Sequence, residues 1–548
     1  MSLFGNLYIG TSGLQTSNTA LNTVAHNLSN LDTTGYTRQQ VIQADRTYNT
    51  IQINSEGVAN QQLGLGVYFA ETKQVRDYFL DQTYREENGR MEFYSVTYSA
   101  FNEIEDLLGE LDGESFNDSL NNLWVSVQEL AKEPSDSVKQ GLLVQRANQF
   151  ITRAASVYND LSSYQDNLNT TIKGYTDRVN DIAERIYDLN NQILRIEVGG
   201  IEHPNDLRDE RNNLLDELSG LMNIEYKEDV DGAVIVKAEG HQLIGRANVQ
   251  KIESYIDPDN GFYTPYWVDD AKLITLDSGT KVPDLTNSKV FDLTQTISTD
   301  RDTDIGSIKA MMLARGDRRA TYVDLNSDTY NETISQSVVM NVQAEFDKLI
   351  HSVTTQMNQV FIDYADPDNN YMVDGNGNPI ELFTRIACDG YDAAGNHIDE
   401  DETDGEEYTL FTVSNIAVNG DLLKEATLLN FIRPDGKEDY SAASALQDVF
   451  TTEAYTLNPN VTNKSNLIDF YSNLVSQVGN SGSVFKSVYD NQQTTVSSTE
   501  EARQQVVGVS DDEELANMIK YQNAYNASSR YITVISEMLE HVITTLGS

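Results

Sequence analysis

The chain contains little cysteine, proline, histidine or basic residue. Its 548 residues include one Cys, nine Pro, six His and 38 Lys plus Arg, against 85 Asp plus Glu. A single cysteine excludes an internal disulfide framework and any zinc site built from several cysteines. The shortage of proline leaves room for long uninterrupted helices. Because 39% of the residues are hydrophobic, the chain can build several packed domains.

The formal charge of −47 excludes further classes of function. Nucleic acids and anionic membranes both attract basic surfaces, so we expect no nucleic acid as a partner and no docking on such membranes. No stretch approaches the roughly 18 apolar residues of a membrane span, and we expect no membrane insertion. The first basic residue is Arg38, so the N-terminus lacks the basic region of a secretory signal.

Patterns of catalytic or metal-binding residues are also missing. The histidines are scattered without a His-Glu-x-x-His zinc motif, and no phosphate loop ending in Gly-Lys-Ser/Thr occurs. Stretches that begin at Asp324 and Asp374 resemble calcium loops, but both lack the required Gly and the bidentate Glu. We therefore expect no enzyme activity, no cofactor and no metal, and an unreactive thiol at Cys388.

The N-terminal segment has a seven-residue apolar repeat and almost no charge. Residues 1–37 contain one acid and no base. One row of the repeat consists of leucines, and a second, partly apolar row lies four residues before it: Leu7, Leu14, Leu21 and Leu28, then Leu3, Gly10, Ser17, Val24 and Leu31. This spacing predicts a helix with one narrow apolar seam. Such a helix is too weakly amphipathic to be stable alone.

The C-terminal segment repeats the pattern. Its two apolar rows are Met518, Tyr525, Ile532, Leu539 and Leu546, and Tyr521, Ser528, Ile535 and Val542. Acidic residues 511–514 precede them, where a helix N-terminus favours negative charge, and Gly547 marks the end. Both terminal helices fit either a bundle within one chain or a coiled coil between copies. The nearly uncharged N-terminal face favours assembly, because identical copies do not tolerate buried like charges.

Between the ends, a long helical region comes first. From Val144 to Ile196 the pattern is helical throughout, and from Leu168 onward apolar residues recur at alternating four- and three-residue spacing. This predicts a long helix starting after Pro134. A further helix is predicted from Pro204-Asn205 through Leu221.

Beyond Leu221 the period changes to that of strands. Asp231-Gly232 is a hairpin turn signal before the β-rich residues 233–238, and residues 263–268 and 272–276 also predict strands. Helices are predicted again at Ser307–Arg315, Asn331–Tyr364 and from Ser441, with a second loop-rich β segment at 366–437.

Both ends resemble known signatures. Residues 20–36, ALNTVAHNLSNLDTTGY, resemble the N-terminal signature of bacterial flagellar rod, hook and hook-associated proteins, and residues 512–530 resemble the matching C-terminal signature. The matching N-terminal positions are Asn27, Leu28, Asn30, Thr34, Gly35 and Tyr36, and the C-terminal ones are Leu515, Ala516, Tyr521, Gln522, Ala524, Tyr525 and Ala527. Asn30 and Asp32 can end the helix by bonding their own backbone, and Gly35 supplies a permissive φ.

Segments in the middle of the chain resemble one particular family among these flagellar proteins. Residues 123–136, 205–218, 416–419 and 470–479 are similar to the flagellar hook-associated protein 1 (FlgK) family. The resemblance implies a structural subunit that joins hook to filament, is required for filament assembly and assembles with itself through its terminal helices. Its implied partners are other copies, the hook protein, a second hook-associated junction protein and an export chaperone at the C-terminal helix. It implies a flagellar, extracellular location, reached by flagellar export without a cleaved signal peptide.

The expected fold is mainly α with inserted β domains. Terminal assembly helices occupy 1–37 and 506–548, a long-helix domain 38–222, 306–365 and 438–505, and β-rich outer domains 223–305 and 366–437. The implied assembly interface consists of Leu7, Leu14, Leu21, Val24, Asn27, Leu28, Asn30, Gly35 and Tyr36 with Leu515, Met518, Tyr521, Tyr525, Ile532, Ile535, Leu539, Val542 and Leu546. Two alternatives stay open: another axial protein of the flagellum (hook, rod or second junction protein), or an axial scaffold with a binding or hydrolytic module at 223–437.

Overall fold

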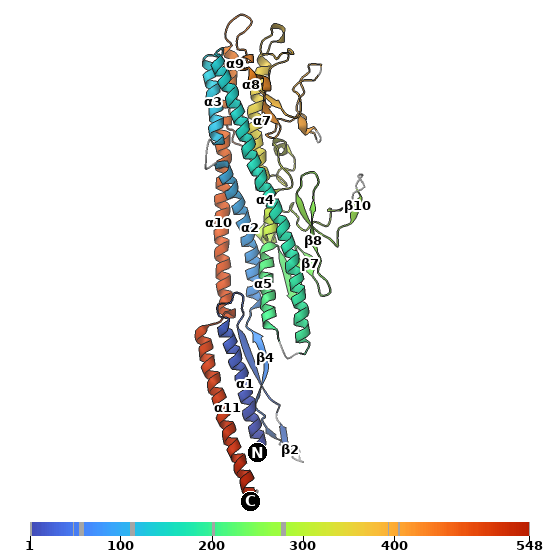
Figure 1. Ribbon diagram of the computed structural model, residues 1–548, viewed down its shortest axis with the longest axis vertical. Helices are drawn as coiled ribbons and strands as arrows, with labels where there is room; N and C mark the ends of the chain where they lie inside the picture. The colour runs from blue at the N-terminus through green and yellow to red at the C-terminus, as the bar shows by residue number, and fades with distance from the viewer. Residues whose placement is uncertain are drawn as a thin grey trace.

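The computed structural model describes residues 3–47, 49–53, 60–109, 115–199, 203–275, 281–392, 394–403 and 406–546. The molecule is elongated, and both chain ends lie at the same pole (Figure 1). Long helices dominate and small sheets are inserted between them, which confirms the predicted mainly α class. Within the described ranges, none of the helices has the length and hydropathy of a membrane span.

Long helices form the body of the molecule. They are α2 (Tyr78–Gly109), α3 (Phe116–Lys132), α4 (Ser137–Glu197), α5 (Asn205–Leu221), α6 (Ser307–Arg315), α7 (Val338–Tyr364), α9 (Tyr440–Thr451) and α10 (Leu467–Val507). The predicted long helix is α4, whose 61 residues begin where the Asp136 side chain accepts a hydrogen bond from the backbone N–H of Val138. α5 begins and ends as predicted, and α10 packs along α2.

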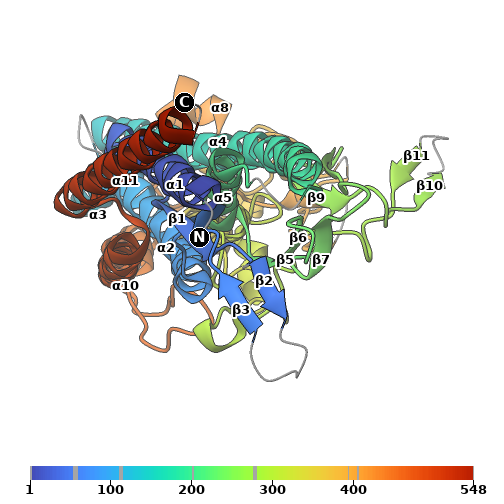
Figure 2. The same cartoon turned by 90° about the horizontal axis from the view of Figure 1, so that it is seen from below.

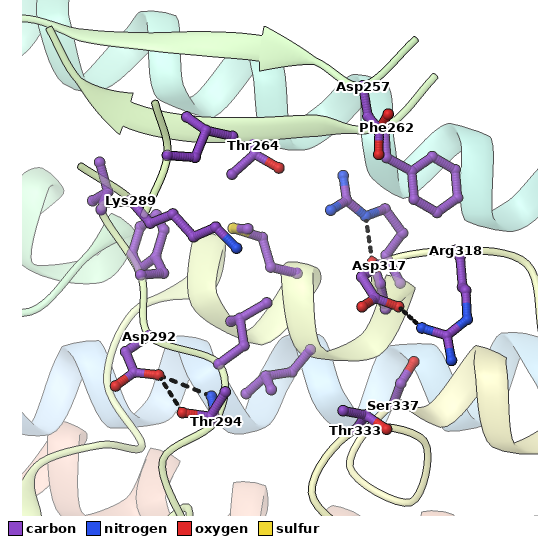
Figure 3. Close-up of a pocket in the computed structure, with 18 of the residues that line it drawn as sticks. Asp257, Phe262, Thr264, Lys289, Asp292, Thr294, Asp317, Arg318, Thr333 and Ser337 are labelled. Carbon is purple, nitrogen blue, oxygen red and sulfur yellow. Dashed lines mark hydrogen bonds and ion pairs between the residues drawn. The ribbon is translucent and has the colours of Figure 1, made fainter. Parts of the chain in front are cut away.

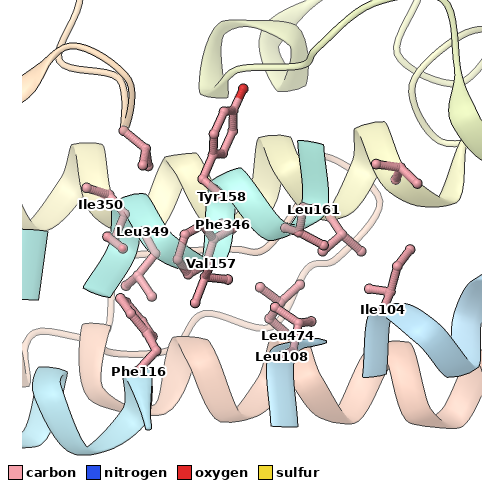
Figure 4. Packing of buried hydrophobic residues seen from close by; sticks show 14 of the residues in the cluster. Ile104, Leu108, Phe116, Val157, Tyr158, Leu161, Phe346, Leu349, Ile350 and Leu474 are labelled. Carbon is pink, nitrogen blue, oxygen red and sulfur yellow. The ribbon is translucent and has the colours of Figure 1, made fainter. Parts of the chain in front are cut away.

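The core of the helical body is built from aromatic and aliphatic side chains of several helices (Figure 4). The fully buried ring of Phe116 on α3 is central to it. Its centroid lies 5.5 Å from that of Phe150 on α4, 4.9 Å from Phe346 on α7 and 4.7 Å from Tyr471 on α10. Helices that are far apart in the sequence are therefore joined by one continuous apolar cluster.

The predicted β domain follows α5 and projects from the body (Figure 1). It contains an antiparallel sheet of β5 (Ile224–Glu228), β6 (Val234–Ala238) and β7 (His241–Ile244), and the hairpins β8 (Ile252–Ile256) with β9 (Tyr263–Trp267) and β10 (Leu273–Thr275) with β11 (Lys281–Pro283). Gly232 has a φ of 84° in the turn before β6, which confirms the hairpin signal.

Residues 366–437 contain less strand than the sequence analysis expected. Apart from the antiparallel pair of β12 (Phe383–Arg385) and β13 (Ile416–Val418) and the short helix α8 (Gly420–Lys424), this segment consists mainly of turns. Aspartates order these turns: Asp374, for example, accepts hydrogen bonds from the backbone N–H groups of Asn376 and Asn378. Short 3₁₀ helices lie at 299–301, 322–326, 367–369, 407–409 and 426–428.

One predicted helix begins later than expected. Residues 331–337 form turns, and α7 starts only at Val338. The Ser337 side chain accepts a hydrogen bond from the backbone N–H of Met340 and so caps the helix there.

The terminal unit comprises α1 (Leu3–Ser29), α11 (Asp511–Leu546), and the hairpins of β1 (Gln39–Asp45) with β4 (Val67–Gln74) and β2 (Asn49–Ile53) with β3 (Asn60–Leu63). α1 and α11 run side by side, and β4 lies along α1 (Figure 1). The sequence analysis placed residues 38–75 in the long-helix domain and predicted no strands there. β1 is largely half-exposed, and its glutamines weaken the alternation of apolar and polar residues that marks a strand.

Candidate assembly interface

The two terminal helices approach closely because small residues lie between them. A Cβ atom on Gly10 would lie 2.8 Å from Cγ1 of Ile532, and one on Gly13 would lie 2.9 Å from Oγ of Ser528. Both distances are shorter than ordinary Cβ contacts, so a larger residue at Gly10 would displace Ile532, and one at Gly13 would require the Ser528 hydroxyl to rotate. The contact pairs the start of α1 with the end of α11, which makes the pair antiparallel.

The predicted interface residues of α1 differ in burial. Val24 and Asn27 are buried, whereas Leu7, Leu14, Leu21 and Leu28 are half-buried, as are Asn30, Gly35 and Tyr36. In α11 only Ile535 of the predicted residues is buried; Met518, Tyr521, Tyr525, Ile532 and Leu539 are half-buried, and Leu515 and Val542 are exposed. The side chain of Leu546 lies outside the described residues. The single chain thus covers its own seam only in part.

An apolar surface that the sequence analysis did not identify lies at the free end of the terminal unit. We call it the apolar tip, and its members are Phe4, Val534, Met538, Val542 and Ile543. Phe4 is 72% exposed and Ile543 68% exposed. Apart from Val542, these residues fall outside the seven-residue rows, so the repeat gave no reason to select them. Exposed apolar groups of this size at one pole are typical of a surface that another molecule covers.

The N-terminal signature builds the turn that reverses the chain after α1. The Asn27 side chain donates to the carbonyl of Gln39 (2.9 Å), and its Oδ1 accepts from the backbone N–H of Gln39 (3.0 Å) and from the Tyr36 hydroxyl (2.8 Å). Asn30 donates to the carbonyl of His26, and Gly35 has a φ of 75°. The backbone bond of Asn30 and the permissive φ of Gly35 are therefore confirmed, whereas Asp32 forms no such side-chain bond among the described residues.

The residues that follow this turn connect the terminal unit to the helical body. Asp209 on α5 accepts from the backbone N–H of Thr37 (3.2 Å) and from Nε2 of Gln74 (2.8 Å). Burial raises the pKa of Asp209 to about 6. Arg38 forms an ion pair with the buried carboxylate of Glu514 at 2.9 Å, and its backbone N–H donates to the carbonyl of Val507. One short loop therefore contacts α5, the end of α10 and the start of α11.

A second charged contact joins the lower ends of the body helices. The carboxylate of Asp216 on α5 accepts from Arg85 on α2 (2.6 Å) and from Arg503 on α10 (2.8 Å). Both guanidinium groups are at most 10% exposed. Buried charges of opposite sign in this geometry fix the relative positions of the three helices just above the terminal unit.

A cavity of about 770 Å³ lies between the β8–β9 hairpin and α6 (Figure 3). Several of its charged side chains are engaged with neighbours: Asp317 pairs with Arg318, Asp292 accepts from Thr294, and Arg315 donates to Asn169 on α4. In the part of the chain that the structure describes, no group of three or more His, Cys, Asp or Glu side chains is arranged to hold a metal ion. The polar groups of this cavity attach the β domain to α4 and α6.

Family models match most of the chain in three segments. The model described as "Flagellar hook-associated protein FlgK helical domain" matches residues 101–366. The model "Flagella basal body rod protein" matches residues 7–37, and "Flagellar basal body rod FlgEFG protein C-terminal" matches residues 489–545. The two short matches coincide with α1 and its turn, and with the end of α10 plus α11.

Individual relatives match over the full length. The flagellar hook-associated protein 1 of Bacillus subtilis is 25% identical and covers 100% of this chain and 99% of its own length. That of Salmonella typhimurium is 26% identical, with 97% and 98% covered. The solved structure of the flagellar hook junction protein FlgK from Burkholderia pseudomallei has the same fold, with a TM-score of 0.53 and 12% identity over 78% of this chain and 100% of that chain. The chain therefore belongs to the FlgK family of flagellar hook-associated proteins.

Proposed function

We propose that this protein is the structural subunit that joins the hook to the filament of a bacterial flagellum and is required for filament assembly. The family to which it belongs consists of structural proteins of the flagellum, and its relatives are named as hook-associated proteins. The observation that carries the proposal is the terminal unit. It pairs both chain ends at one pole and leaves the half-buried leucines and the apolar tip for contacts with neighbouring copies.

The proposal extends to partners and location. The hook protein and a second hook-associated junction protein would contact the two ends of a ring or helix of these subunits. An export chaperone would cover exposed apolar residues of α11, such as Leu515 and Ile519, before assembly. The protein acts outside the cell, leaves it without a cleaved signal peptide, and is not an enzyme.

Removal of the gene tests the role directly. A strain that lacks it should carry bare hooks and release flagellin into the medium. Normal filaments would overturn the proposal, and the absence of hooks would indicate an earlier rod or hook component instead.

The predicted interface is tested by Leu21→Asp and Leu28→Asp. Each leucine is half-buried on α1, so the single chain can solvate an aspartate there, whereas an assembled neighbour would bury an unpaired charge. We expect loss of filaments in cells, with the circular dichroism and thermal melting of the helical body unchanged. Val138→Asp is the matched control, because Val138 is 76% exposed on α4 far from the terminal unit. Filaments of normal number and length with Leu21→Asp and Leu28→Asp would contradict the proposed interface.

A further inference from the structure

The β10–β11 hairpin is an arm that stands away from the rest of the molecule (Figures 1 and 2). The described residues of this arm are 273–275 and 281–283, paired in antiparallel register. Neither strand packs extensively on another described helix or strand. Nevertheless the arm carries large apolar side chains: Leu273 is 68% exposed and Ile274 is 45% exposed. Both strand edges also leave backbone donors and acceptors unpaired, which makes the arm a template for contact with another chain.

A groove of about 820 Å³ lies on the helical body between α2, α6, α7 and α10. Its floor includes the buried side chains of Phe93 and Leu313, and its walls include the half-buried rings of Tyr94, Phe101 and Phe485. The rings of Phe101 and Phe485 stack with their centroids 5.2 Å apart, which gives the groove a rigid aromatic wall.

The groove differs from the rest of the surface in charge. No described residue that lines it is acidic or basic, although 22% of the chain is charged and the net charge is −47. Identical acidic copies repel each other wherever their charged surfaces meet. A charge-free surface is where a second copy can approach at the lowest electrostatic cost.

The polar groups of the groove are suited to an extended backbone. They are hydroxyl and amide groups of Ser, Thr, Asn and Gln, spaced among the aromatic rings. A strand edge that enters the groove could exchange backbone hydrogen bonds with these hydroxyl and amide groups, while apolar side chains of the strand contact the rings.

The positions of arm and groove fit a contact between neighbouring copies. The arm lies on the side of the molecule away from α10, the helix that contributes Phe485 to the groove (Figure 2). It is also about level with the middle of α10 along the long axis (Figure 1). Two different surfaces at one level, one on an arm that stands out from the β domain and one on the helical body, can join copies head to tail around an axis parallel to the long axis, which generates a ring or a shallow helix.

We propose that the arm of one copy occupies the charge-free groove of the next copy. Ile274 contacts the aromatic wall, and the strand edge bonds the amide groups of the groove. This inference rests on the proposed function, in which copies assemble side by side, and it adds a lateral contact in the helical body to the contacts of the terminal unit.

Disulfide cross-linking in isolated flagella tests the contact. Cells that lack the gene would co-express two full-length versions, both carrying Cys388→Ser: one with Ile274→Cys in the arm and one with Ser481→Cys in the groove. Ser481 lines the groove and is half-buried, so neither substitution disturbs the core. A disulfide forms only when the two Cα atoms come within about 7 Å. We expect a mixed dimer on a non-reducing gel after oxidation, and its loss on reduction.

The control replaces Ile274→Cys by Val230→Cys, which is 97% exposed between β5 and β6 of the same domain. A mixed dimer as strong with Val230→Cys as with Ile274→Cys would overturn the inference, as would dimers of Ile274→Cys with itself alone. If both versions are incorporated into flagella but no mixed dimer forms, the inference fails while the proposed function stands. If neither version is found in flagella, the proposed function fails as well.

Discussion

Asp209 illustrates how one side chain couples the terminal unit to the body, and it makes the contact sensitive to pH. Its pKa of about 6 in the folded protein exceeds the ordinary value of about 3.9, because the carboxyl is buried between α5 and the turn after α1. The folded state therefore binds the proton more tightly than the unfolded state. This contribution to stability is fully present below the unfolded pKa and is lost as pH rises through about 6.

We predict a pH-dependent difference between the wild type and Asp209→Asn. Asparagine has the same shape but does not titrate, so any lost hydrogen bond shifts stability equally at every pH. Between about pH 7 and pH 4 the difference in the free energy of unfolding should move in favour of the wild type by up to about 3 kcal/mol. Parallel melting-temperature profiles of the two proteins over this interval would show that Asp209 is already ionised in the fold.

At the scale of residues, the sequence predicted features that involve neighbours along the chain, but it did not predict contacts between residues far apart in the sequence. The backbone bond of Asn30 and the positive φ of Gly35 depend on residues close by in the sequence, and both were predicted correctly. The contact between Thr37 and Asp209 joins residues that are 172 positions apart, so only the packing of the turn after α1 against α5 brings them together. Arg38 was noted only as the first base of the chain, whereas it holds the start of α11 through Glu514.

At the scale of elements, the terminal helices and the body helices differ in how much apolar surface they bury. Among the described residues of α11, Ile535 is the one buried apolar residue. In contrast, α4 buries a long row of apolar residues that includes Leu161, Ile172 and Ile186. Backbone hydrogen bonds open more readily where fewer apolar contacts must break. The terminal unit is therefore the less stable part of the isolated chain.

We predict that amide hydrogen exchange will separate the two parts. In purified monomer, peptides from α1 and α11 should exchange at least about tenfold faster than peptides from α4, which corresponds to a difference of about 1.4 kcal/mol in the opening free energy. In assembled flagella the terminal peptides should become protected. Equal protection of α11 and α4 in the monomer would contradict this order of stability.

The elements themselves were predictable to different degrees. α4 and α5 were predicted because apolar residues recur with the period of a helix and a proline, followed by Ser-Asp before α4 and by Asn before α5, marks each start. The strands β1 and β4 were not, because both are largely half-exposed and show no clean alternation. The groove could not be predicted, since segments from several helices and loops contribute to it and none of them has a charge-free pattern by itself.

At the scale of the whole molecule, the net charge of −47 opposes the association of identical copies. Salt shortens the range of this repulsion from about 30 Å at 0.01 M to about 8 Å at 0.15 M. We predict that self-association of the purified full-length protein, measured by sedimentation velocity, increases over this range of salt. Sucrose at matched osmolality is the control, and association that weakens with added salt would show that attraction between charges holds the copies together.

The pairing of α1 with α11 has a consequence for the order in which the molecule folds. The close contact of Gly10 with Ile532 closes nearly the whole chain into one loop, and such a contact costs more conformational entropy than the local contacts of the body. The terminal unit should therefore form last, after the helices of the body have brought the segments of α1 and α11 close to each other. A chain that ends before α11 can form its helical body but not the pair of α1 with α11. Because this pair also forms the proposed assembly interface, only chains that contain both terminal helices can be incorporated.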